Sequence, residues 1–139
     1  MSDSQRFPVA AHVLAYLAHK DAFSAAAAVS SSELAQSVAT NPVVVRRVTA
    51  LLVRAGLIGT RRGASGGAWL TRPAAEIGLD AVLRAVNGSA HMGVPPVGSK
   101  ACPVGERLPG AVQAAIAAAD EAAARQLGRV SVADLLAAE

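Results

Sequence analysis

The sequence has little of what a secreted or membrane protein needs. It contains one cysteine, Cys102, among 139 residues, which excludes a disulfide within the chain and favours a reducing compartment. The N-terminus is polar and shows no secretory leader, and no apolar run approaches the roughly 20 residues of a membrane span. We therefore expect a cytoplasmic protein that does not enter a membrane.

Patterns typical of catalysis and metal binding are missing as well. His12, His19 and His91 have no metal-ligand spacing, and no nucleophile–base pair or carboxylate pair stands out. The glycine-rich segment 63–67 is not followed by the Gly-Lys-Ser/Thr of a phosphate-binding loop. We expect no catalytic residue, no bound metal and no cofactor, so the sequence does not indicate an enzyme.

Aromatic residues are scarce, at 3%, although 53% of the residues are hydrophobic. Alanine supplies much of this apolar content, which favours closely packed helices, so we expect a mainly α-helical fold. The net charge is +3, but residues 1–75 carry +5 and residues 76–139 carry −2. A basic first half suits contact with a polyanion, although an ordinary solvated surface fits this excess about equally well.

Capping signals predict two short helices joined by a tight turn. Ser30 and Glu33 form the S-x-x-E pattern, in which hydroxyl and carboxylate each satisfy a backbone N–H at a helix start. Asn41 is a favourable N-cap, and the proline after it suits the first turn of a helix over Pro42–Ala55 that stops at Gly56. The connection of about three residues is typical of a helix-turn-helix. An earlier helix is predicted from about Phe7 to His19, followed by an alanine-rich segment, 22–29, without a clear pattern.

The second helix of this pair has two different faces. Its core face is predicted to hold Val45, Val48, Leu51 and Leu52. The side chains left wholly or partly outward are Val43, Val44, Arg46, Arg47, Ala50 and Arg54. Outward valines beside paired arginines suit a helix that lies in the major groove of DNA, because arginine can bind a guanine edge and valine can pack on a thymine methyl.

A β-hairpin is predicted directly after this helix. Two short extended segments, 57–60 and 68–71, flank a basic tip that contains Arg61 and Arg62. Gly63, Gly66 and Gly67 allow the backbone to turn tightly there. A hairpin behind a helix-turn-helix is a wing, and its arginines could reach phosphates or a narrow minor groove.

The C-terminal half predicts a linking helix, a loop and a long helix. The linking helix spans about Ile77–Asn87, residues 89–105 form a Gly/Pro-rich loop, and the long helix spans about Glu106–Leu127. Ser131 with Asp134 caps a last short helix. An apolar stripe of the long helix contains Leu108, Val112, Ile116, Ala119, Ala123 and Leu127. It either packs back on its own domain or pairs with the same helix of a second copy; we favour the dimer.

These features predict a mainly α winged helix-turn-helix with a two-stranded wing and a long C-terminal dimerisation helix. The chain divides into a DNA-binding domain (1–75), a linking helix with an effector loop (76–105), and the dimerisation and C-terminal helices (106–139). We expect a sequence-specific transcriptional regulator that binds a double-stranded DNA operator as a homodimer. The expected contact residues are Asn41, Val43, Val44, Arg46, Arg47, Arg61, Arg62, Gly63, Gly66 and Gly67. The alternative is a winged-helix protein–protein interaction module that does not touch DNA.

The sequence also resembles the Rrf2 family of bacterial transcriptional regulators over about Phe7 to Leu136. The motifs that carry the resemblance are Asn41-Pro-Val-Val-Val-Arg-Arg-Val, Ala55-Gly-Leu-Ile, Arg62-Gly-Ala-Ser-Gly-Gly-Ala-Trp-Leu and Glu76-Ile-Gly-Leu. The resemblance implies a homodimer in which a long helix crosses to the partner. It also implies base contacts from Val43, Val44 and Arg46 and a wing arginine, Arg62, in the minor groove. The regulator is either a repressor or an activator; we favour a repressor.

The sequence departs from many Rrf2 members in the loop before the long helix. Those members hold a [2Fe–2S] cluster there with three cysteines, whereas this loop offers only Cys102, which His91 and Glu106 could supplement. We therefore place the chain in a cluster-free subgroup. Cys102 is either a partly buried residue that anchors the loop or a thiol switch, and two such thiols could bridge subunits. The effector is an oxidant or a small molecule. A small molecule would bind in an apolar pocket near Met92, Val94, Val97 and Val104; the alternative is that these residues only pack against the core.

Overall fold

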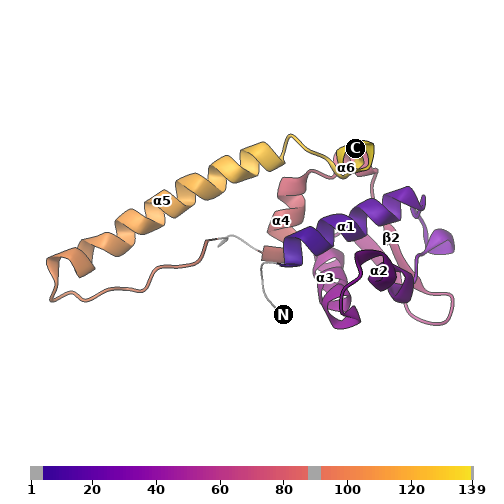
Figure 1. Cartoon of the computed structure of the whole chain (residues 1–139), viewed down its shortest axis with the longest axis horizontal. Helices are drawn as coiled ribbons and strands as arrows, with labels where there is room; N and C mark the ends of the chain where they lie inside the picture. Colours follow the sequence, from indigo (N-terminus) through magenta and orange to yellow (C-terminus); the bar gives the residue numbers. More distant parts are fainter. Residues whose placement is uncertain (1–4, 88–91, 139) are drawn as a thin grey trace.

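All elements but one pack into a head, from which a single long helix extends (Figure 1). The computed structural model describes residues 5–87 and 92–138. Its elements are α1 (Arg6–His19), η2 (Ala25–Ala27), α2 (Ser31–Val38), α3 (Pro42–Arg54), β1 (Ile58–Arg61), β2 (Gly67–Leu70), η3 (Ala74–Glu76), α4 (Leu79–Asn87), α5 (Pro103–Leu127) and α6 (Val132–Ala137). The expected mainly α winged helix-turn-helix, with a two-stranded wing and a long C-terminal helix, is confirmed.

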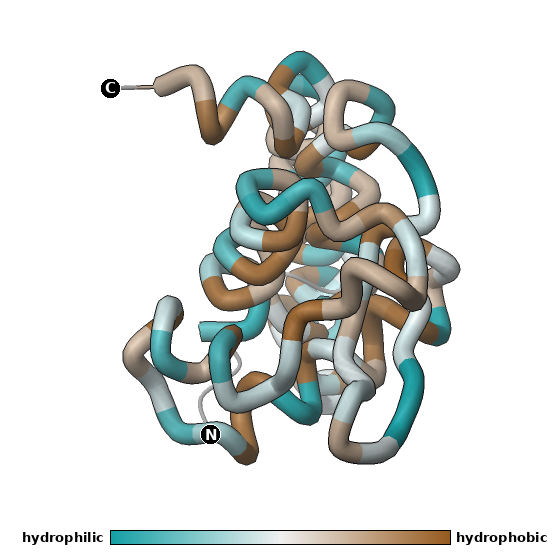
Figure 2. The backbone as a smooth tube through the Cα atoms, turned by 90° about the vertical axis from the view of Figure 1, so that its right-hand side faces the viewer, coloured by the Kyte–Doolittle hydropathy of each residue, from teal (hydrophilic) through white to brown (hydrophobic). Residues whose placement is uncertain are grey.

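The core of the head lies between α1, α3, α4 and the wing. Leu14, Leu17 and Leu52 are fully buried, as is Val132 at the start of α6. Along the helices of the head, hydrophobic and hydrophilic segments alternate, as expected for helices with one face in a core (Figure 2). The core thus draws on α6 and not only on residues 1–75; the three-part division of the chain stays a prediction.

The helix-turn-helix forms through the two expected caps. The Ser30 Oγ accepts a hydrogen bond from the Glu33 N–H at 3.1 Å, and the Asn41 Oδ1 accepts one from the Val43 N–H at 2.9 Å. Between the two helices Ala39 adopts the left-handed conformation, with φ 59°. The expectation of a complete capping box at α2 is wrong, because the Glu33 carboxylate accepts a hydrogen bond from the Tyr16 hydroxyl of α1 instead.

The wing is tied to the start of α2. Strands β1 and β2 pair antiparallel, with Ile58 opposite Leu70 and Arg61 opposite Gly67. The alanine-rich segment for which no pattern was visible ends in a β-bridge, in which Val29 exchanges backbone hydrogen bonds of 2.9 and 2.8 Å with Ala68. Because Ser30 follows Val29 directly, the wing and the N-terminus of α2 are coupled through the backbone.

The linking helix begins two residues later than expected, at Leu79, and the long helix begins three residues earlier, at Pro103. The first difference arises because Ile77 and Leu79 pair with the segment before α6: the Leu79 N–H donates to the Val130 carbonyl and the Val132 N–H donates to the Ile77 carbonyl, both at 2.9 Å. The second arises because α5 is capped by Cys102, with a proline in its first turn.

The apolar stripe of α5 lies largely on the surface of the chain. No residue of α5 is buried, and Leu108 and Val112 are 53% and 38% exposed. The helix packs mainly on α4 near its C-terminal end, and its N-terminal half extends away from the head (Figure 1). Packing on its own head covers Leu127 at the C-terminal end of the stripe but not the N-terminal part that holds Leu108 and Val112.

Candidate nucleic-acid interface

Of the four expected contact residues that lie within α3, three are on its outward face. Val43 is 42% exposed, and Arg46 and Arg47 are exposed as well. The expectation of an outward Val44 is wrong, because Val44 is only 8% exposed. Val44 lies one residue before Val45 and one helical turn before Val48. The buried face of α3 is therefore wider than a single apolar stripe and includes Val44.

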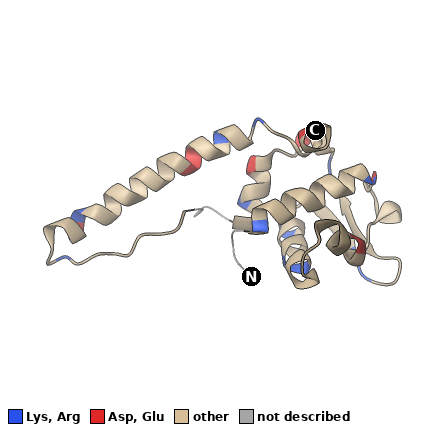
Figure 3. Ribbon diagram, in the orientation of Figure 1, with Lys and Arg blue, Asp and Glu red and all other residues tan. Residues whose placement is uncertain are grey.

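A groove of about 500 Å³ runs between α3, the N-terminus of α2 and the wing. It brings together Arg46 of α3 with Arg61 and Arg62 of the wing, and we call it the basic groove. Its other lining residues are Ser30, Ser31, Leu34, Thr49, Ala50, Val53, Thr60, Gly63, Ala64, Gly66, Gly67 and Ala68. In Figure 3, Lys and Arg segments of α3 and of the wing loop lie at the same side of the head. No acidic residue is among these lining residues, so the groove suits an anion.

Arg46 also borders a second hollow of about 370 Å³, between α2 and the start of α3. This hollow is lined by polar residues of α2 and of the turn, which are Ser31, Ser32, Gln36 and Thr40, together with Ala35 and Pro42. Arg46 therefore lies on a ridge between two concave surfaces. The expected residues Asn41, Val43 and Arg47 do not line the basic groove; Asn41 instead caps α3, and Val43 and Arg47 lie on the exposed face of the helix.

Sequence reasoning missed several residues of this surface. Thr49, Val53 and Thr60 line the basic groove. The start of α2 was not missed, because the sequence predicts that the free N–H groups at Ser30–Glu33 suit phosphate, and Ser31 there borders both hollows. No comparable signal identifies Thr60, because its position depends on the pairing of β1 with β2.

The glycines of the wing shape its tip and its contact with α2. Gly63 has φ +110°, and the Gly66 N–H donates to the Gly63 carbonyl at 3.0 Å. A Cβ on Gly67 would lie 2.2 Å from the Val29 carbonyl oxygen. Arg61 turns back toward the tip, where its Nη2 donates to the Ser65 carbonyl at 3.4 Å, whereas Arg62 is exposed.

A polar cluster joins α1 to the first turn of α2, next to the basic groove. The Tyr16 hydroxyl donates to the Glu33 Oε2 at 2.6 Å, and the Lys20 Nζ lies 3.4 Å from the same oxygen. The hydrogen bond from Tyr16, followed by the charge of Lys20, holds the pKa of Glu33 below its ordinary value. The same hydrogen bond and the nearby carboxylate raise the pKa of Tyr16.

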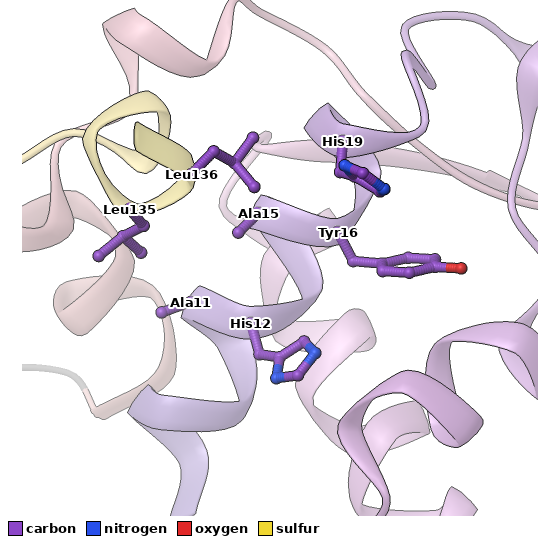
Figure 4. A pocket seen from close by; sticks show the side chains of 7 residues that line it. All are labelled: Ala11, His12, Ala15, Tyr16, His19, Leu135 and Leu136. Atoms are coloured by element: carbon purple, nitrogen blue, oxygen red, sulfur yellow. The ribbon is translucent and has the colours of Figure 1, made fainter. Parts of the chain in front are cut away.

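Two further hollows are apolar. One lies between α1 and α6, where Leu135 and Leu136 of α6 face Ala11 and Ala15, while His12, Tyr16 and His19 point away from α6 (Figure 4). The other lies between residues 92–98 and the N-terminal half of α5. Of the residues expected around an effector pocket, Met92 and Val94 line this hollow, whereas Val97 and Val104 do not.

The residues present do not fit an iron–sulfur cluster. Cys102 is the one cysteine of the sequence, and a cluster needs several protein ligands. Glu106 lies in the first turn of α5, and His91 lies outside the described residues. Over residues 5–87 and 92–138, no group of three or more His, Cys, Asp and Glu side chains could hold a metal ion.

Cys102 itself is exposed, so the expectation of a partly buried residue is wrong. Its Sγ accepts a hydrogen bond from the Gly105 N–H at 3.4 Å and thereby caps α5. The side chain is exposed because Cys102 stands at the N-terminal end of α5, which extends away from the head (Figure 1).

No helix in the described ranges is long and apolar enough to cross a membrane.

Comparison with known proteins places this arrangement in a family. A model of the Rrf2 family, described as iron-dependent transcriptional regulators, matches residues 3–138. The chain is 32% identical over 134 residues, 96% of each chain, to a protein of Bacillus subtilis (strain 168) provisionally named HTH-type transcriptional regulator YwnA.

Two crystal structures agree with this match. One, of a protein provisionally described as DNA-binding, has a TM-score of 0.70 and 32% identity and covers 94% of this chain and 98% of its own. The other, of a provisionally assigned transcriptional regulator from Lactobacillus plantarum, has a TM-score of 0.71 and 27% identity and covers 95% and 87%. The chain belongs to the Rrf2 family of transcriptional regulators.

Proposed function

We propose that the protein is a homodimeric, sequence-specific DNA-binding repressor that acts in the cytoplasm and works without an iron–sulfur cluster. The observation that carries this proposal is the basic groove, in which arginines from α3 and from the wing converge beside the N-terminus of α2. Three cations and a set of free helix N–H groups on one concave surface match the phosphate backbone and groove edges of duplex DNA.

The recognition helix α3 enters the major groove with its N-terminal half. Arg46 and Arg47 bind base edges, and Val43 packs against a thymine methyl. Val44 has no part in this contact because it is buried. Arg62 at the exposed tip of the wing reaches the adjacent minor groove or its phosphates.

The remaining expected residues have supporting roles. Asn41 positions the start of the recognition helix, because its Oδ1 accepts the Val43 N–H and so caps α3. Arg61 contacts phosphate once it leaves the Ser65 carbonyl. Gly63, Gly66 and Gly67 allow the wing to approach the DNA backbone closely.

Arg46→Ala is expected to weaken binding to the operator by about 1–3 kcal/mol, mostly at one base pair, because a bidentate arginine–guanine contact is lost. Arg54→Ala is the matched control, since Arg54 lies in the last turn of α3, does not line the basic groove and can lose only general electrostatic attraction. Salt-titrated gel shifts on DNA selected from genomic fragments measure both variants.

The interaction-module alternative makes the opposite prediction. A protein that never touches DNA shows no sequence-preferring complex at physiological salt, with Arg46 or without it. Such a result contradicts the proposed function.

The proposed signal enters at the loop before α5, as an oxidant at the exposed Cys102 or as a small apolar molecule beside residues 92–98. We expect Cys102→Ser to keep the DNA affinity of the reduced protein, because serine also caps a helix, and to abolish the response to diamide. Equal responses of the wild type and of Cys102→Ser, measured by gel shift, contradict the oxidant route. Cys102→Ala separates loss of the cap from loss of the thiol.

A further inference from the structure

The acidic residue nearest to the start of α2 is held away from the basic groove. Glu33 occupies the third position of α2, in the same turn as Ser31, which lines that groove. Its carboxylate is not at the helix N-terminus but on α1, with the Tyr16 hydroxyl at 2.6 Å and the Lys20 Nζ at 3.4 Å.

The chain itself shows where such a carboxylate goes when nothing competes for it. At α6 the related S-x-x-D motif forms a complete capping box, in which the Ser131 N–H donates to the Asp134 Oδ2 at 2.8 Å and the Asp134 N–H donates to the Ser131 Oγ at 3.1 Å. At α2 only the second of these two bonds is made, from the Glu33 N–H to the Ser30 Oγ. The two caps differ in the length of the acidic side chain, Glu33 against Asp134, and in that Tyr16 of α1 and Lys20, which follows α1, offer Glu33 a hydroxyl and an ammonium group.

A complete capping box at α2 would place a negative charge against the DNA. Ser30 lines the basic groove, so a carboxylate bonded to the Ser30 N–H would lie beside the site proposed for a phosphate. Two negative charges a few ångströms apart repel, and the carboxylate would also occupy an N–H that an anion could use.

We propose that Tyr16 and Lys20 are positioning residues for DNA binding, which hold the Glu33 carboxylate on α1 and so keep the N-terminus of α2 open to a phosphate. This inference rests on the proposed function. The lowered pKa of Glu33 agrees with it, since the carboxylate is stabilised in its charged form where it lies.

The test is a cycle of variants measured by gel shift on one operator. The double variant Tyr16→Phe/Lys20→Met is expected to bind about 3- to 10-fold more weakly than the wild type at low salt. Adding Glu33→Gln to it restores wild-type affinity, because the charge that needed to be held is gone. Glu33→Gln alone stays within about 2-fold of the wild type.

A structural control separates charge from docking of α1 on α2. Ser37→Ala removes the other side-chain hydrogen bond between these helices, 2.9 Å between the His12 Nε2 and the Ser37 Oγ, without changing charge beside the groove. It is expected to leave DNA affinity unchanged. The loss of DNA affinity in Tyr16→Phe/Lys20→Met should also become smaller as the salt concentration is raised from about 0.05 to about 0.5 M, because salt screens the repulsion between the Glu33 carboxylate and the phosphate.

Every result of these measurements either supports or overturns the positioning role of Tyr16 and Lys20. No loss of affinity in Tyr16→Phe/Lys20→Met, a loss that Glu33→Gln does not rescue, or an equal loss in Ser37→Ala overturns the proposal while the proposed function stands. Failure of the wild type to bind any operator overturns the proposed function, and the positioning role with it. Rescue by Glu33→Gln together with salt dependence supports the proposal.

Discussion

Val112→Asp is expected to turn the proposed dimer into a monomer and to weaken binding to a two-half-site operator by about 100-fold or more. The second half-site is bound intramolecularly once the first is occupied, and loss of such a link costs about 10²–10⁴ in avidity. This is the largest effect expected from any single side chain outside the core.

The reason lies in the apolar stripe of α5. Leu108, Val112 and Ile116 follow one another at intervals of four residues, so they lie on one face of the helix. Leu108 and Val112 are 53% and 38% exposed in the single chain. All three also line the hollow beside residues 92–98, and a second α5 would cover the part that this segment leaves open. A carboxylate at the centre of that contact would be buried without a partner, which costs several kcal/mol.

Gln113→Asp provides the matched control. Gln113 is exposed and adjacent in sequence, but it lies about 100° further around the helix, so the same charge is added off the stripe. Sedimentation analysis gives the oligomeric state of both variants, and gel shifts on one and on two half-sites give their affinities. A dimeric Val112→Asp with unchanged affinity contradicts the assignment of this stripe to the dimer.

The elements that the sequence predicted most closely depend on local chemistry. Asn41 followed by proline defines the start of α3 whatever surrounds it, because the side chain caps its own backbone within two residues. The same holds for Ser131 and Asp134 at α6. The end of α3 is equally local, since Gly56 has φ +78°.

Several features that the sequence did not predict depend on residues far apart in the chain. The bridge between Val29 and Ala68 and the pairing of Ile77 with Val132 join segments about 40 and 55 residues apart. Glu33 makes only one of the two hydrogen bonds of a capping box, because its carboxylate accepts a hydrogen bond from Tyr16 on another helix instead.

The candidate site follows the same division. The arginines of α3 and of the wing could be proposed from their positions in two local motifs, but their convergence in one groove depends on how α3 packs against β1. The burial of Val44 shows the limit of a pattern argument, because a valine at the edge of an apolar stripe can lie on either side of the boundary.

Gly67→Ala is expected to lower the free energy of unfolding by about 2–4 kcal/mol, since it adds backbone strain and a steric clash at one position. Gly67 has φ +152°, a conformation that side-chain-bearing residues rarely adopt. A Cβ there would also meet the Val29 carbonyl oxygen at 2.2 Å and the Ser30 nitrogen at 2.9 Å.

The clash cannot be relieved cheaply, because the atoms that it strikes are backbone atoms. Val29 exchanges two hydrogen bonds with Ala68, which is 4% exposed, and Ser30 caps α2. Moving Val29 away from an alanine at position 67 therefore opens the bridge and shifts the N-terminus of α2 together with the wing. DNA affinity is expected to fall along with stability, at temperatures where the variant is still folded.

Gly110→Ala is the control for the substitution itself. Gly110 lies inside α5, and a Cβ there has no atom within 4 Å, so this variant should gain up to about 1 kcal/mol from helix propensity. Urea unfolding at one fixed protein concentration measures both variants, because the stability of a dimer depends on concentration. A lower free energy of unfolding in Gly67→Ala together with a higher one in Gly110→Ala indicates that the wing and α2 are rigidly connected. An unchanged free energy of unfolding in Gly67→Ala means that the wing moves independently of the helix-turn-helix.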